Sequence, residues 1–397
     1  MDELAAHYDV VCIGGAMMGS SAAYFLSENP DFDGSVLVVE PDWTYERAQT
    51  TRAQNSIREQ FTNELNIELS RFGIDFLADF HANVQVNGEA PELNFRGTGY
   101  MFIADTEDQY AQLERESDDQ LAMGAEVEML RPHQVAERFP YMDAEQLVGA
   151  RVGGMREGSF DGWAFFQGLR QRAIHNGVTY VKDRVVGIDV KGSRVTGVRL
   201  ESGRTVGCDF ALNTAGCRAK TIAAMVGIDL PVEPRARTSF VFDCRTPIEH
   251  NVPLTVTPVG VHFRREQTHF MCGTVPRIDI AVDYDDLDVR RNEFEEQIWP
   301  TVAKYVPQFD QVGVVTSWGG QYDYNTLDHN LIIGAGSQVE NFLFANGFSG
   351  HGLQQGPAVG RGLSELITYG EFRTIDLSSL DYGRIERNEP IIELAVI

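Results

Sequence analysis

The chain of 397 residues is too long for one small core, which favours two domains. Its 33 basic and 58 acidic residues give a formal net charge of −25, which disfavours nucleic acid and anionic membrane surfaces as partners. No apolar run approaches the roughly eighteen residues of a membrane span, and the first residues carry no secretion or transit signal, so we expect a cytoplasmic protein.

The first elements are a strand, a glycine-rich turn, a helix and a second strand that ends in an acid. Residues 10–13 and 36–40 are continuous apolar runs, as expected of strands buried on both faces. In such a βαβ unit a dinucleotide places its pyrophosphate on the helix N-terminus and a ribose beside the carboxylate. We therefore predict a dinucleotide site at residues 14–19, which read Gly-x-Ala-x-x-Gly.

Each residue of this motif has a physical role in binding a dinucleotide. Gly14 permits a tight turn that a Cβ would obstruct, and Gly19 lets the helix pack close to the strand. Glu40 lies twenty-one residues after Gly19, where a carboxylate accepts hydrogen bonds from ribose hydroxyls and would repel a 2′-phosphate. A glycine-rich turn without a ligand, the alternative interpretation, leaves the spacing of Glu40 unexplained.

Helices and strands continue to alternate up to residue 216. The expected helices are 64–80, 108–123 and 161–176, and the expected strands are 97–104, 178–180, 185–190, 195–200 and 205–208. A further apolar strand, 210–216, ends in Ala215 and Gly216. Such a strand can return to the parallel sheet and pass close to a cofactor, although a simple strand–helix turn fits the spacing equally well.

The pattern changes between residues 232 and 318. Alternating strands at 238–242, 260–264 and 269–273, with one helix at 286–305, predict a mainly antiparallel sheet in a separate substrate domain. Strands at 331–333 and 342–345 and a helix at 355–368 then return to the first domain. The five cysteines are scattered and odd in number, so we expect reduced core residues, with neither disulfides nor a metal site.

A second glycine-rich motif, Gly-Phe-Ser-Gly-His-Gly, follows the strand at 342–345 and opens the last predicted helix. Its backbone N–H groups and the positive helix end form an anion cradle. Such a cradle could face the N1–C2=O edge of a flavin, where reduction leaves negative charge. Enzymes that use NAD alone do not need it.

With these motifs in order, the chain resembles the family of FAD-dependent amine and amino-acid oxidoreductases that includes glycine oxidase, sarcosine oxidase and dimethylglycine dehydrogenase. The resemblance rests on the fingerprint at 14–19, the Asn-Thr-Ala-Gly turn at 213–216 and the motif at 347–352, and it spans nearly the whole chain. Within the family, residues 322–328 and 352–357 resemble the branch that is linked to assembly of mitochondrial respiratory complex I.

The resemblance implies an α/β fold, with a Rossmann-like FAD-binding domain and a second α+β substrate domain built on a mainly antiparallel sheet. We expect the FAD-binding domain to be discontinuous, over residues 1–85, 150–230 and 328–397. The substrate domain would comprise residues 86–149 and 231–327.

The resemblance also implies where FAD lies. The pyrophosphate would lie on the first glycine-rich turn, the adenosine ribose at Glu40, the adenine at the backbone of Val185, and the flavin ring at the second motif. The implied cofactor-binding residues are Gly14, Gly15, Ala16, Met17, Met18, Gly19, Glu40, Pro41, Thr51, Arg52, Asn55, Ser56, Val185, Ala215, Gly216, Gly350, His351, Gly352, Leu353 and Gln354.

The departures from the family pattern concern the covalent attachment of the flavin and its reaction with oxygen. Some relatives attach the flavin through a Cys near the position of Gln321, and others through a His after the second strand, where residues 41–61 have none. The flavin is therefore expected to be non-covalent. Met271 and Gln354 stand where sarcosine oxidase has two Lys residues near the flavin, which implies a dehydrogenase rather than a fast oxidase.

Four residues are candidates for the chemistry: Arg58, His351, Tyr322 and His262. Arg58 would contact flavin or substrate, or else form a surface ion pair. His351 would donate to the flavin or only shape its turn, and Tyr322 would hydrogen-bond substrate or only pack. His262, like Arg264, would bind a carboxylate, or else lie on the solvated face of a strand.

Three functions remain open. The first is transfer of hydride from a small amine, amino acid or N-methyl amino acid to flavin N5, giving an imine that hydrolyses, with a protein or a quinone among the candidate electron acceptors. The second is a 2-hydroxy-acid dehydrogenase, which would need a base such as His262 or His351 for the O–H proton. The third is a flavin-bearing assembly or scaffold protein without turnover.

Overall fold

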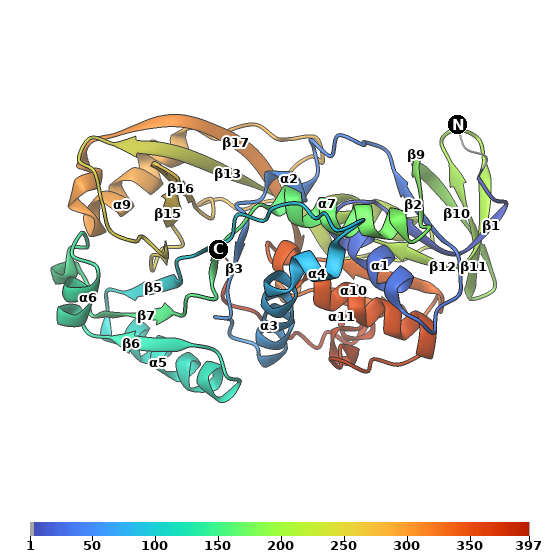
Figure 1. Cartoon of the computed structure of the whole chain (residues 1–397), viewed down its shortest axis with the longest axis horizontal. Coiled ribbons are helices and arrows are strands. Elements are labelled where there is room, and N and C mark those ends of the chain that lie inside the picture. The colour runs from blue at the N-terminus through green and yellow to red at the C-terminus, as the bar shows by residue number, and fades with distance from the viewer. Residues whose placement is uncertain (1–3, 397) are drawn as a thin grey trace.

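The structure, a computed structural model, describes residues 4–396. Within that range two large sheets lie at opposite ends of the molecule, with helices packed against each (Figure 1). A three-stranded sheet joins β3 (Ser56–Ile57), β8 (Gly158–Ser159) and β4 (Arg96–Gly97). No helix among the described residues is long and apolar enough to cross a membrane.

The first sheet carries the predicted dinucleotide turn. Its strands, in spatial order, are β10 (Val185–Lys191), β11 (Arg194–Leu200), β12 (Thr205–Asn213), β1 (His7–Ile13), β2 (Val36–Glu40) and β9 (Thr179–Lys182). On this path β12, β1, β2 and β9 run parallel to one another. Two further strands, β18 (Ile332–Ala335) and β19 (Phe342–Asn346), join through β19, which pairs in parallel with β12.

Both faces of this sheet are buried, which explains the continuous apolar runs of β1 and β2. Val10 and Cys12 face one core, and Val11 and Ile13 face the other. The first core is covered by α1 (Met17–Glu28), α3 (Glu64–Ala78), α7 (Gly162–His175) and α10 (Gly352–Tyr369). The second core is covered by α8 (Ala219–Ala224).

The second sheet is mainly antiparallel, as predicted. Its strands, in spatial order, are β17 (Val312–Asn325), β13 (Val232–Cys244), β16 (His269–Gly273), β15 (His262–Glu266), β14 (Leu254–Val256), β5 (Tyr100–Ala104), β7 (Gly149–Gly153) and β6 (Val127–Leu130). The remaining helices are α2 (Gln49–Arg52), α4 (Phe80–Val84), α5 (Glu107–Ala122), α6 (Pro132–Arg138), α9 (Trp299–Tyr305) and α11 (Gly383–Arg387).

Several predicted elements differ from the observed ones. The two strands expected at 205–208 and 210–216 are one strand, β12. The helix expected at 286–305 begins only at Phe294, because Asp283 and Asp286 accept hydrogen bonds from backbone N–H groups two residues on and hold the preceding segment in turns. The helix expected at 64–80 ends at Ala78, and α4 follows.

β17 was not predicted as one strand, because its Gly319–Gly320 pair and exposed first half hide the alternation. It pairs with β13 along its whole length. β7 begins at Gly149 and pairs with β5 and β6, so this strand crosses the predicted domain boundary at residue 150. The division into domains otherwise stays a prediction.

Candidate active site

A cavity of about 800 Å³ extends between the two large sheets. One wall comes from the ends of β1, β2 and β12 and the first turns of α1 and α10. The other wall comes from β13, β15, β16 and β17, which contribute Arg237, His262, Gly273 and Tyr322. The cavity is thus long enough to touch both the predicted dinucleotide turn and the predicted substrate sheet.

The first glycine-rich turn is shaped by backbone contacts. Gly14 has a φ of 105°, and a Cβ there would lie 2.6 Å from the Thr214 carbonyl oxygen. A Cβ on Gly19 would lie 1.9 Å from the Gly14 carbonyl oxygen, so α1 can approach β1 only with glycine there. Gly15 and Gly19 do not line the cavity, whereas Gly14, Ala16, Met17 and Met18 do. Gly15 and Gly19 therefore shape the turn, and their contact with a cofactor stays a prediction.

The N-terminus of α1 is open to an anion. Ala16 supplies no side-chain cap, and the first turn holds no acidic residue. The Met17 N–H donates to Thr50 Oγ1 over 3.3 Å. The unsatisfied N–H groups and the positive helix end suit a pyrophosphate.

Glu40 lies at the end of β2, where the cavity begins. Its Oε2 accepts from the Gly15 N–H at 2.8 Å, and its Oε1 accepts from the Asp42 N–H at 2.9 Å. Burial raises the pKa of this carboxyl above its usual value, an effect that these two donors oppose. Each oxygen keeps a second lone pair, so the carboxylate can also accept from ribose hydroxyls.

The turn after β12 is tied to the second glycine-rich motif. A Cβ on Gly216, whose φ is 53°, would lie 2.2 Å from Gln49 Oε1. Gln49 Nε2 donates to Asp323 Oδ1 at 3.1 Å, and Asp323 Oδ2 accepts from the Gly347 N–H at 2.9 Å. Burial raises the pKa of Asp323 to about 6. This network holds the β12 turn, β17 and the start of the second motif together.

The second motif forms a cradle at the start of α10. Gly350 has a φ of 101°, and a Cβ there would lie 2.6 Å from the Tyr322 ring. His351 supplies no side-chain cap to α10, and Gly352, Leu353 and Gln354 line the cavity. The cavity is therefore bordered by two uncapped helix N-termini, one at each glycine-rich turn.

Arg58 lies beneath this cradle and is 1% exposed. Its Nη1 donates to the Gln60 carbonyl oxygen at 2.6 Å, and its Nη2 donates to the Ala395 carbonyl oxygen and contacts His351 Nε2 at 3.2 Å. The guanidinium also lies over the Phe61 ring, 4.2 Å from its centroid. The alternative of a surface ion pair for Arg58 is wrong.

His351 is buried against Arg58. Burial, reinforced by the neighbouring guanidinium, lowers the pKa of His351 to about 3. The ring is therefore neutral at neutral pH, and its Nε2 can accept the Arg58 hydrogen bond. His351 lines the cavity from the side of α10.

His262 lies on the opposite wall, and its Nε2 is 3.1 Å from Gln54 Oε1. The Gln54 amide nitrogen points at the Cys272 carbonyl oxygen and Ser239, so its oxygen faces His262, which donates. Burial lowers the pKa of His262 to about 4. His262 and Arg264 are 7% and 4% exposed, so the alternative of a solvated strand face is wrong.

The structure brings most of the predicted residues to this one cavity. Those that line it are Gly14, Ala16, Met17, Met18, Glu40, Pro41, Arg52, Asn55, Ser56, Arg58, Val185, Ala215, Gly216, His262, Tyr322, Gly350, His351, Gly352, Leu353 and Gln354. Thr51 does not line it, because its hydroxyl donates to the Tyr45 and Ala48 carbonyl oxygens.

Sequence reasoning missed Arg237, Gln54 and Thr274, which also line the cavity. Arg237 forms a bidentate ion pair with Asp279, at 2.7 and 3.0 Å, and lies over the Tyr322 ring. These residues come from separate strands and loops, and no local motif marks them.

The residues present fit a dinucleotide with a flavin ring. Gly14, Gly216 and Gly350 line the cavity and permit tight turns in which a Cβ would collide with the protein itself, so the backbone rather than side chains faces the cavity there. The two helix N-termini suit a pyrophosphate at one turn and a ring edge that gains negative charge at the other.

Comparisons with known proteins identify the family of the chain. The family described as "FAD dependent oxidoreductase" matches residues 9–366. FAD-dependent oxidoreductase domain-containing protein 1 of Xenopus laevis is 34% identical, over 98% of this chain and 85% of the relative. Sarcosine oxidase subunit beta of Rhizobium meliloti (strain 1021) is 26% identical, over 92% of this chain and 85% of the relative.

Among solved structures, the L-proline dehydrogenase of P. horikoshii shares the fold, with a TM-score of 0.85 at 23% identity. The alignment covers 98% of this chain and 100% of that one. Together with the match over residues 9–366, these relatives show that the chain belongs to the family of FAD-dependent oxidoreductases.

Proposed function

We propose that the protein oxidises the C–N bond of a small amine, amino acid or N-methyl amino acid to an imine, which then hydrolyses. The observation that carries this proposal is the hydrogen bonding of the two histidines that line the cavity. His262 donates its Nε2 proton to Gln54, and the Nε2 of His351 is engaged by Arg58. Neither is poised to take a proton from a substrate.

This arrangement favours an amine over a hydroxy acid. An amine that has lost its ammonium proton to solvent before it binds uses its own lone pair when hydride leaves the adjacent carbon and becomes an iminium ion, so the hydride step itself needs no base in the cavity. An alcohol must lose its O–H proton, and the burial that lowers the pKa values of His262 and His351 also makes both weak bases. FAD, when bound, supplies the hydride acceptor.

The chain's own residues would bind, orient and shield the substrate. The N-terminus of α10 and the Arg58 guanidinium place positive charge at the cradle, where hydride transfer leaves negative charge. Tyr100, which is buried, and Tyr322, which is half-buried, line the cavity beside Arg58 and limit access of water.

We further propose a dehydrogenase rather than a fast oxidase, with a protein or a quinone as electron acceptor. Met271 is buried and contacts Arg264 Nη2 through Sδ at 3.4 Å, and Gln354 Oε1 accepts from the Arg58 N–H at 2.9 Å. Neither side chain carries the ammonium charge of the two Lys residues of sarcosine oxidase. Slow recovery of the flavin band in air, after anaerobic reduction by substrate, would support this proposal, and rapid recovery in air would oppose it.

The reaction products separate the two chemical alternatives. An amine substrate releases ammonia or methylamine together with the carbonyl product, whereas a 2-hydroxy acid yields a keto acid alone. Stoichiometric ammonia or methylamine supports the proposal, and a keto acid without either contradicts it.

Acid precipitation is expected to release all of the flavin into the supernatant. The Gln321 amide donates to the Asp283 and Asp286 carbonyl oxygens, both at 2.8 Å, and supplies no nucleophile to a flavin. Among the described cysteines only Cys217 lines the cavity, and burial raises its thiol pKa well above the usual value. Yellow colour left in the pellet would contradict non-covalent binding, and its loss in Cys217→Ser would identify the attachment point.

A further inference from the structure

Residues 391–396 follow α11 and reach Arg58 and His351, two residues that line the cavity. The Ala395 carbonyl oxygen there accepts a hydrogen bond from Arg58 Nη2 and lies 3.3 Å from His351 Nε2. A backbone group of this segment is therefore a direct partner of Arg58 and a close neighbour of His351, which Arg58 also contacts.

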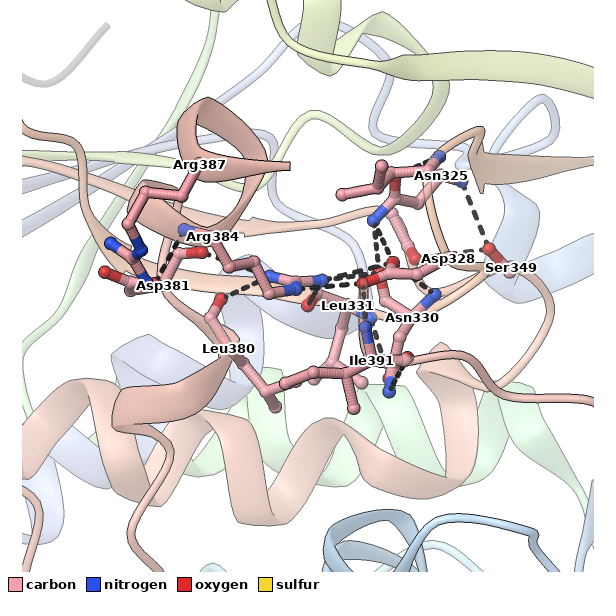
Figure 2. A network of polar contacts seen from close by, with 12 residues as sticks. Asn325, Asp328, Asn330, Leu331, Ser349, Leu380, Asp381, Arg384, Arg387 and Ile391 are labelled. Atoms are coloured by element: carbon pink, nitrogen blue, oxygen red, sulfur yellow. Dashed lines mark hydrogen bonds and ion pairs between the residues drawn. The ribbon is translucent and has the colours of Figure 1, made fainter. Parts of the chain in front are cut away.

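The segment is anchored by buried polar groups. The Ile391 N–H donates to Asp328 Oδ2 at 3.0 Å, and Asn330 Nδ2 donates to the Ile391 carbonyl oxygen at 3.1 Å (Figure 2). The Glu393 N–H donates to the Asp328 carbonyl oxygen at 3.1 Å. These bonds fix the path of the segment toward Arg58.

Glu393 is the charged residue of this segment, and it is fully buried. Its Oε1 accepts from the N–H and Oγ1 of Thr62 and from the Ala395 N–H, at 2.8 to 3.0 Å. Its Oε2 accepts from the Asn63 N–H at 3.2 Å and from Asn66 Nδ2 at 2.9 Å. Burial would raise the pKa of Glu393, but the neighbouring His351 and these donors together hold it below its usual value.

Glu393 and Arg58 are opposite buried charges, and Glu157 is a second buried carboxyl group that acts on Arg58. Among the described residues, neither Glu393 nor Arg58 forms an ion pair within 4.0 Å, and a buried ion without compensation is costly. Ala395 links them, because its N–H donates to Glu393 and its carbonyl oxygen accepts from Arg58. The two charges also attract each other directly through the low-dielectric interior.

We propose that Glu393 is a positioning residue of the flavin site: through Ala395 it holds Arg58, and through Arg58 the His351 ring, in place, and its charge offsets that of Arg58 and so sets the reduction potential of the flavin. This inference rests on the proposed position of the flavin ring at the N-terminus of α10. It concerns the cofactor alone and is independent of the substrate.

The test is the two-electron midpoint potential of the FAD-bound protein. Glu393→Gln keeps the shape and removes the negative charge, so the positive field of Arg58 on the reduced ring becomes stronger. We expect reduction to become more favourable by about three- to tenfold, which is about 15–30 mV for a two-electron couple. Glu393→Asp retains the charge and is expected to keep the potential near that of the wild type.

The matched control is Glu365→Gln. Glu365 is also buried and hydrogen-bonded, but it lies thirteen residues along α10 from Gly352, or about 20 Å at 1.5 Å per residue. Loss of the Glu365 charge can destabilise the protein without shifting the midpoint potential of the flavin. A shift in Glu365→Gln equal to that in Glu393→Gln would overturn the inference, because it would reveal a general effect of lost stability.

The Arg58→Gln variant distinguishes failure of the role proposed for Glu393 from failure of the proposed position of the flavin ring. If the ring lies at the α10 cradle, removal of the Arg58 charge lowers the potential. A lowered potential in Arg58→Gln together with an unchanged one in Glu393→Gln would overturn the role of Glu393. Unchanged potentials in both variants would instead place the ring elsewhere, and the proposed site itself would be wrong.

A measurement on the wild-type chain covers the case in which Glu393→Gln does not retain FAD. Amide hydrogen exchange of residues 391–396 is compared in the FAD-bound protein and after FAD removal. We expect this segment to lose protection when FAD is removed, while the strands of the second sheet keep theirs. Equal protection of residues 391–396 in both states would overturn the inference.

Discussion

Replacing Asp328 by Ala is expected to lower the free energy of unfolding by about 3–5 kcal/mol. The Asp328 and Arg384 side chains are 0% and 2% exposed, with Arg384 Nε 2.9 Å from Asp328 Oδ2 (Figure 2). Asp328 Oδ1 also accepts from Asn325 Nδ2 at 2.8 Å. The substitution would leave the Arg384 guanidinium buried without its counter-ion, and equilibrium urea unfolding monitored by circular dichroism would measure the loss.

Two comparisons test this explanation. The double variant D328A/R384M removes both charges and is expected to be more stable than D328A alone, because no unpaired ion remains buried. The exposed pair Arg138–Glu128, with a distance of 2.9 Å, is the control, and Arg138→Met is expected to cost about 1 kcal/mol or less. A D328A variant as stable as R138M would show that the buried pair does not stabilise the fold.

Replacing Glu40 by Ala is expected to weaken FAD binding by about 10- to 150-fold, which corresponds to the roughly 1.5–3 kcal/mol of a hydrogen bond to a charged group. The carboxylate is expected to bind the adenosine ribose, and it also holds the Gly15 and Asp42 N–H groups. Its loss therefore removes a ligand contact and loosens the first glycine-rich turn. Flavin fluorescence during titration of the FAD-free protein would give the dissociation constant.

Asp42→Ala is the matched control for this change. Asp42 lies two residues from Glu40 and also lines the cavity, but its side chain bonds within its own loop, chiefly to Thr44. Its removal is expected to leave FAD affinity within a few-fold of the wild type. Full FAD occupancy of Glu40→Ala after gel filtration, or equal losses in both variants, would contradict the assignment of Glu40 to the ribose.

The parts of the fold that depend on local patterns could be predicted from the sequence. β1, α1 and β2 are encoded by an apolar run, a glycine turn and a second apolar run, and the structure has them in place. Gly14 and Gly350 were predictable for the same reason, since positive φ angles and close backbone approach leave few alternatives to glycine. The family resemblance extended this prediction to FAD.

The parts that depend on distant contacts could not be predicted. Arg237 meets Asp279 across a loop, and Ala395 reaches Arg58 from the far end of the sequence, without a local signal for either contact. His262 and Arg264 resembled a solvated strand face because their polar partners, Gln54 above all, lie more than two hundred residues away in the sequence. Burial of polar side chains is decided by such partners rather than by periodicity.

The central proposal, oxidation of a C–N bond at a non-covalent FAD, is tested most directly by an anaerobic absorbance scan. The FAD-bound protein is mixed with amino acids, N-methyl amino acids, simple amines and 2-hydroxy acids, and the flavin band near ~450 nm is followed. We predict bleaching by a member of the amine or amino-acid classes and none by the 2-hydroxy acids. Bleaching by 2-hydroxy acids alone, or by dithionite but by no compound of the panel, would contradict the proposal and favour the hydroxy-acid or the scaffold function respectively.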